Sequence, residues 1–150
     1  MAILAGQVYI NDTDIYTEFG AFLSEQRKGA KENSKSIFTP SKLKKQVAVD
    51  FREKPGEKYP KNLMNVNEAR DVTLTFCIYA KTKADWLSKY KAFITFIKAG
   101  WLDFYFPSID HRMRMFYKSC SGFSPISYIW VEGVQAAHFK IVFREPSPTF

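Results

Sequence analysis

The most regular alternation of apolar and polar positions lies in residues 70–80, RDVTLTFCIYA. Every second position there is apolar: Val72, Leu74, Phe76 and Ile78. Successive side chains of a strand point to opposite faces of a sheet. The segment therefore predicts a long antiparallel strand with one buried face.

The apolar period changes directly after this strand. From residue 82 to residue 100 the apolar positions are spaced as on one face of an α-helix: Trp86, Leu87, Tyr90, Phe93, Ile94 and Ile97. Thr82 precedes Asp85 by three residues, as in a capping box, and Gly100 stands where a left-handed C-cap is expected. The pattern predicts a helix over about Lys83 to Ala99.

Shorter patterns predict the remaining strands. Residues 8–25 predict two strands joined by a tight turn at NDTD, with a bulge or a close backbone approach at Gly20. Val47, Val49 and Phe51 predict a strand with one solvated face. Beyond the helix, strands are expected within residues 101–107, 111–120, 128–133 and 134–145. With seven or eight strands and one helix, the chain predicts a single α+β domain, a mostly antiparallel sheet or sandwich with one flanking helix.

Composition narrows the class of protein. The 150 residues are 46% hydrophobic and 17% aromatic, which suits one packed domain and excludes a disordered chain. Two cysteines are too few for a disulfide scaffold, so a reducing compartment is expected. No apolar run is long enough to span a bilayer, and the opening residues lack the basic start of a signal peptide, so no membrane contact is expected.

The net charge of +7 is unevenly distributed. Residues 1–25 hold four acids and no Lys or Arg, whereas residues 26–62 hold eleven bases against four acids. Glycine, serine, asparagine and proline accompany the bases, which predicts a flexible basic arm at about 26–45 and a second loop at about 54–69. The arm either docks on an acidic partner or is a solvated loop whose lysines keep the protein soluble.

Motifs for catalysis and for cofactor binding are missing from the sequence. His111 and His138 have no second ligand at metal spacing, and no phosphate loop or nucleophile motif occurs. The aspartates of the two closest carboxylate pairs lie in or beside turns, where Asp serves backbone hydrogen bonding. We therefore expect no enzyme activity, no metal and no cofactor.

A basic and aromatic strand gives the alternative function. In HRMRMFYK, Arg112, Arg114 and Lys118 share a face with Phe116. Such a face can hold phosphates and stack a base, as single-stranded nucleic-acid binders do. The same pattern also suits an edge strand whose charges deter aggregation.

Two stretches carry a family resemblance. YINDTDIYTEFGAFLSE is similar to the opening of phage and prophage tail components of the distal-tail type, although NDTD replaces their usual Asn-Gly turn. RDVTLTFCIYAKTKADWLSKYKAFITFIKAGWLDFYFP resembles the core of the same domain, a long strand, a helix, a glycine and a strand that leads to a proline. The resemblance implies a tail-tube-like fold.

The resemblance also implies a role. Six copies would form a ring in the virion tail, assembled in the bacterial cytoplasm, with other tail proteins as partners and DNA only as passing cargo. Head-to-tail rings join two different patches of each subunit. The expected contacts are an acidic hairpin and a basic arm anchored by two apolar residues: Asp12, Asp14, Glu18, Lys28, Lys31, Lys35, Ile37, Phe38, Lys42, Lys44 and Lys45.

Overall fold

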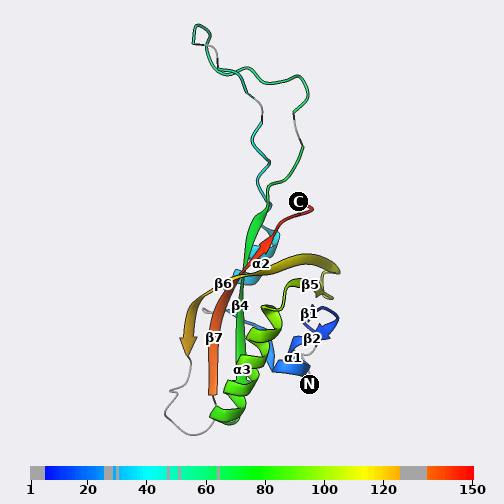
Figure 1. The fold of residues 1–150 in the computed structure, drawn as a ribbon, viewed down its shortest axis with the longest axis vertical. Helices are drawn as coiled ribbons and strands as arrows, with labels where there is room; N and C mark the ends of the chain where they lie inside the picture. The colour runs from blue at the N-terminus through cyan, green and yellow to red at the C-terminus, as the bar shows by residue number, and fades with distance from the viewer. Residues whose placement is uncertain are drawn as a thin grey trace.

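One curled antiparallel sheet of seven strands forms the body of the protein, in the order β2-β1-β5-β6-β7-β4-β3 (Figure 1). The computed structural model describes residues 6–25, 29, 31–46, 48–50, 52–63, 65–125 and 135–150. The strands are β1 (Tyr9–Ile10), β2 (Thr13–Asp14), β3 (Ala21–Leu23), β4 (Arg70–Ala80), β5 (Trp101–Phe106), β6 (His111–Pro125) and β7 (Gln135–Glu145). The helices are α1 (Ile15–Phe19), α2 (Glu32–Phe38) and α3 (Lys83–Ile97).

Strand β4 confirms the strongest sequence pattern. It pairs with β7 along its whole length, from Arg70 opposite Glu145 to Ala80 opposite Gln135. Its apolar positions face the core, and Phe76 is fully buried. β3 pairs with only three residues of its other edge.

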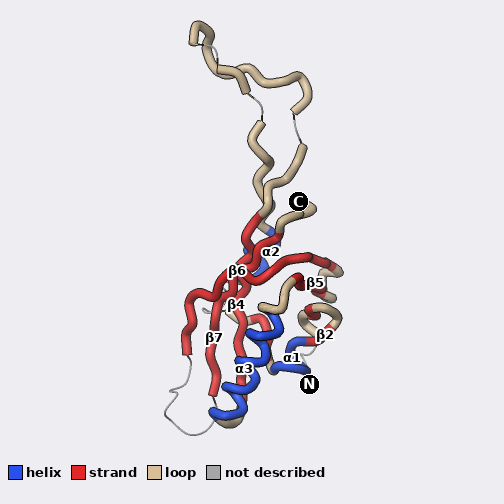
Figure 2. The backbone as a smooth tube through the Cα atoms, in the orientation of Figure 1, coloured by secondary structure: helices blue, strands red, loops and turns tan. Residues whose placement is uncertain are grey.

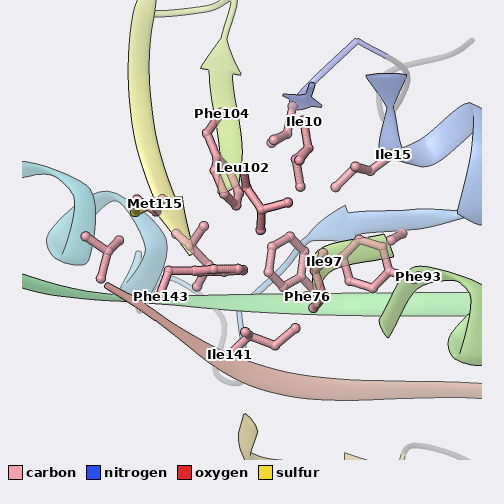
Figure 3. Close-up of a cluster of buried hydrophobic side chains, with 14 of the residues drawn as sticks. Ile10, Ile15, Phe76, Phe93, Ile97, Leu102, Phe104, Met115, Ile141 and Phe143 are labelled. Atoms are coloured by element: carbon pink, nitrogen blue, oxygen red, sulfur yellow. The ribbon is translucent and has the colours of Figure 1, made fainter. Parts of the chain in front are cut away.

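The core lies between the sheet and α3 (Figure 3). The ring centroid of Phe93 on α3 lies 5.3 Å from that of Phe76 on β4 and 6.1 Å from that of Phe139 on β7. Ile97 and Phe143 are also fully buried in this cluster. Burying an aromatic side chain removes a large apolar area from water, so these contacts dominate the packing.

Helix α3 has the predicted extent and the predicted N-cap. The Thr82 side chain accepts a hydrogen bond from the backbone N–H of Asp85 at 3.2 Å. Two details differ: Leu87, expected on the buried face, is exposed, and the C-cap is Lys98 rather than Gly100. The helix rests on only part of the sheet, so Leu87 has no surface to cover it.

The N-terminal hairpin is confirmed in part. Asn11 and Asp12 form its turn with positive φ angles of 52° and 64°, which short polar side chains tolerate. The second strand stops after two residues and continues as α1, and Gly20 is the left-handed C-cap of that helix, not a bulge.

The expected flexible arm at 26–45 instead contains helix α2. Past the end of β3, this helix covers the exposed edge of β4. Ser36 Oγ accepts the N–H of Thr73 at 2.7 Å, and Asn33 Oδ1 accepts the N–H of Thr75 at 2.6 Å. These side chains take the place of a neighbouring strand by accepting hydrogen bonds from the β4 backbone. The local sequence pattern does not predict this pairing.

Residues 42–68 project from the body of the protein (Figures 1 and 2). From here on, the arm means this segment and not the one expected at 26–45. Its two sides run antiparallel, with isolated bridges from Leu43 to Asn67 and from Val49 to Lys58. The expected half-buried strand is therefore wrong at Val49, which is exposed; Val47 and Phe51 lie outside the described residues. The loop expected at 54–69 forms most of the tip and the returning side of this arm.

The α+β class with an antiparallel sheet is thus confirmed, and the described residues contain three helices where one was expected. The described strands form a single sheet, not a sandwich. The strand expected at 128–133 lies outside the described residues. Within the described ranges, no helix is long and apolar enough to cross a membrane.

A buried ion pair fastens the foot of the arm. Arg70 Nε lies 2.6 Å from Glu145 Oε1, and both side chains are less than a tenth exposed. Arg70 also donates to the carbonyl of Thr39, just before the arm begins, and its guanidinium packs over the ring of Phe150.

Glu145→Ala leaves the Arg70 charge buried without its partner. We expect the free energy of unfolding in urea to fall by about 3–5 kcal/mol. The double variant Arg70→Met/Glu145→Leu removes both charges and is expected to recover most of this loss. A single variant as stable as the original chain would contradict a buried pair.

Candidate interaction surfaces

The acidic contact expected at the N-terminal hairpin is only partly available. Asp14 is the N-cap of α1: its carboxylate accepts hydrogen bonds from Gly6 N, Tyr16 N and Thr17 Oγ1. Asp12 in the turn and Glu18 on α1 are exposed. Asp14 therefore has a structural role that its position in a turn allowed but its charge alone did not reveal.

The basic contact residues divide between two places. Lys31 and Lys35 belong to the start and the last turn of α2, whereas Lys42, Lys44 and Lys45 lie at the foot of the arm. All five are exposed, and Lys28 lies outside the described residues.

The apolar anchor is wrong for one of its two residues. Ile37 is 4% exposed and belongs to the core of its own subunit. Phe38 is exposed and borders a hollow of about 400 Å³ between α2 and the end of β5, with Phe106 and Ile109 among its lining. The physical reason is that α2 turns its single buried side chain toward the sheet.

The residues predicted for the alternative face on β6 are all exposed. Met113 and Met115 point to the core, whereas Arg112, Arg114 and Phe116 are exposed on the opposite side of the sheet. β5 lies beside them: Trp101 pairs with Phe116, Asp103 with Arg114 and Tyr105 with Arg112. We call this surface the outer face, defined by Trp101, Asp103, Tyr105, Arg112, Arg114, Phe116 and Lys118.

Close aromatic and guanidinium contacts order the outer face. The guanidinium carbon of Arg112 lies 4.2 Å from the ring centroid of Tyr105, and that of Arg114 lies 4.7 Å from that of Trp101. Trp101 and Phe116 meet edge to face, with centroids 5.4 Å apart. Such cation–π and edge-to-face contacts hold the side chains in defined positions on the sheet.

The carboxylate of Asp71 on β4 binds Lys118 of the outer face and Arg144 on β7. Lys118 Nζ lies 2.7 Å from one oxygen of Asp71, and Arg144 lies 3.0 Å from the other. The hydrogen bond from Lys118 holds the pKa of Asp71 below its ordinary value, with Arg144 adding to the effect. Asp71 therefore keeps its negative charge and forms ion pairs with both Lys118 and Arg144.

A hollow opens at one end of the outer face. Its volume is about 490 Å³, and its lining is Lys98, Gly100, Trp101, Phe116 and Tyr117. The ammonium of Lys98 lies 5.1 Å from the ring centroid of Tyr117. Three aromatic rings and a cation border this hollow.

Trp101 and Tyr105 were missed as site residues in the sequence. Their signal was present: Leu102, Phe104 and Phe106 alternate with them, and a short turn at residues 107–110 joins the two strands. Counting outward from that turn places Trp101 opposite Phe116. The register between β5 and β6 depends on the length of this turn, which the sequence pattern did not determine.

Some of the side chains able to do chemistry are held in structural contacts. Ser24 Oγ and His138 Nδ1 lie 2.7 Å apart, within hydrogen-bonding distance. Burial raises the pKa of the Cys77 thiol to about 11, so it is a poor nucleophile at neutral pH. No cluster of three or more metal-ligating side chains occurs among the described residues.

Comparison with protein-family models, with characterised proteins and with solved structures found no match to this chain. The function therefore rests on the residues and surfaces described above.

The two cysteines predict different labelling behaviour. Cys77 is buried with a raised pKa, whereas Cys120 is exposed, although its pKa is also raised by partial burial. Iodoacetamide at pH 8 is expected to modify Cys120 first and Cys77 only upon unfolding in urea. Peptide mass spectrometry distinguishes the two sites, and equal rates in the native protein would contradict the burial of Cys77.

Proposed function

We propose that this protein is a structural subunit that associates head-to-tail with copies of itself into a ring, as a component of a phage or prophage tail. The proposal rests on the arm. This segment, residues 42–68, projects from the body (Figure 1). It carries apolar side chains that are exposed to solvent.

The arm is poorly suited to exist without a partner. Its exposed apolar residues are Leu43, Val49, Tyr59, Leu63 and Val66, and Leu63 reaches 62% exposure. Its described backbone pairing is sparse, with bonds such as Val49 N to Lys58 O at 2.8 Å and Lys44 N to Val66 O at 2.8 Å. A two-stranded ribbon is marginally stable in water, and exposed apolar groups of this kind mark interaction sites.

The neighbouring copy supplies complementary charge. The arm carries Lys42, Lys44, Lys45, Arg52, Lys54, Lys58 and Lys61 against four acids. Asp12 and Glu18 are exposed at the opposite, N-terminal part of the body. A contact between two different patches repeats from copy to copy and closes into a ring when the rotation allows it.

The order of the elements along the chain supports the proposed role in a phage tail. The long strand β4, the helix α3, Gly100 and the strand β5 leading to Pro107 follow one another as in the resemblance noted in the sequence. This role requires no catalytic residue. In it, other tail proteins are further partners, and DNA passes through the ring.

The test is removal of the arm's apolar groups by Leu43→Ser/Val49→Ser/Leu63→Ser. The triple variant is expected to self-associate at least tenfold more weakly, because buried interface anchors contribute about 1 kcal/mol or more each. Sedimentation velocity across a concentration series measures the change, and electron microscopy of the concentrated original chain looks for rings with a channel.

The matched control is Leu87→Ser, which removes a similarly exposed leucine from α3. Circular dichroism establishes that both variants keep their fold. An original chain that stays monomeric at the highest concentration, or an arm variant that associates as the original does, would count against the proposal.

A further inference from the structure

The outer face carries groups that the fold itself does not require. Trp101 is 50% exposed and Phe116 is 36% exposed, although any polar residue would satisfy a solvent-facing position of the sheet. Their rings add nothing to the core, which lies on the other side of the sheet. Their placement needs another explanation.

We propose that the outer face binds a single strand of nucleic acid, with bases stacked on Trp101 and Phe116 and phosphates held by Arg112 and Arg114. The hollow beside the two rings receives one base. This site lies within one copy of the chain and is independent of ring formation.

The spacing of the side chains fits a polymer that presents bases and phosphates in turn. Every second residue of a strand lies on the same face, about 6.7 Å farther along. Along β6, Arg112, Arg114 and Phe116 are exposed at every second position, and the exposed Lys118 follows at an irregularity of the strand pairing between Tyr117 and Ser119. Trp101 lies directly across from Phe116 and doubles the aromatic surface.

The charges favour a polyanion over other ligands. Arg112, Arg114, Lys118 and Arg144 stand against the carboxylates of Asp71 and Asp103. A neutral sugar would use the rings and gain little from the cations, and an acidic peptide would use the cations and gain little from the rings. An unpaired nucleic acid uses both, because every base has a face that stacks on an aromatic ring.

Single strands are favoured over duplexes by the shape of the surface. The outer face is a sheet with projecting aromatic rings. The bases of a nucleic acid must be unstacked from one another before they can stack on these rings. A duplex offers this face only its phosphates. The site should therefore discriminate between a single strand and a duplex of the same length.

Fluorescence anisotropy of a labelled dT oligonucleotide of about 12 nucleotides tests the site at low salt. Trp101→Leu/Phe116→Leu is expected to weaken binding at least fivefold through lost stacking. Arg112→Gln/Arg114→Gln is expected to weaken binding and to lower the slope of log K against log salt by about 0.7 per lost phosphate contact. The control Lys81→Gln/Lys91→Gln makes the same charge change on exposed lysines away from this face.

Asp71→Asn gives a change of the opposite sign. It removes a carboxylate that holds Lys118 and Arg144, and it is expected to tighten binding about threefold to tenfold because both cations become free for phosphates. A variant that misfolds would not gain affinity.

Three results would overturn the proposal: no binding by the original chain at low salt, equal loss in the lysine control and in the arginine pair, or equal affinity for duplex and single strand. Weaker binding confined to the arginine and ring variants, together with the gain from Asp71→Asn, would support it.

Discussion

The packing of α3 against one face of the sheet is the contact on which the rest of the structure depends. The helix contributes Phe93 and Ile97 to a cluster in which Phe76 and Phe139 come from two adjacent strands. The sheet curls toward this helix, so the side that carries Phe76 and Phe139 is buried, whereas the other side is exposed on β5 and β6. The outer face follows from that asymmetry, because no second layer of the described residues covers it.

The edges of the sheet are controlled by side chains more than by strands. Asn33 and Ser36 satisfy the backbone of β4 beyond the end of β3, and the Gln7 side chain accepts the N–H of Leu23 on β3. At the other end, Asn11 Oδ1 accepts the N–H of Asp103 on β5 at 2.9 Å. Such capping suppresses uncontrolled pairing between sheets and leaves the arm as the exposed apolar extension.

The two surfaces differ in how well they are ordered before any partner arrives. The rings and guanidinium groups of the outer face stand on paired strands and contact one another, so little side-chain entropy is lost upon binding. The arm has few backbone hydrogen bonds among its described residues, and in the proposed ring its position is defined by the neighbouring copy. A rigid face suits a ligand that must be aligned, whereas an adaptable arm suits contact with a neighbouring subunit.

Sequence alone determined β4, α3 and the exposed basic side of β6, because each depends on the local period of apolar residues. Helix α2 escaped that reasoning because no side chain caps it at Lys31, and its residues are fixed by hydrogen bonds to Thr73 and Thr75 far along the chain. The burial of Ile37, the pairing of the arm's two sides and the meeting of Trp101 with Phe116 likewise join distant segments. Only the tertiary structure decided these features, since the free energy that selects them comes from contacts that no local pattern records.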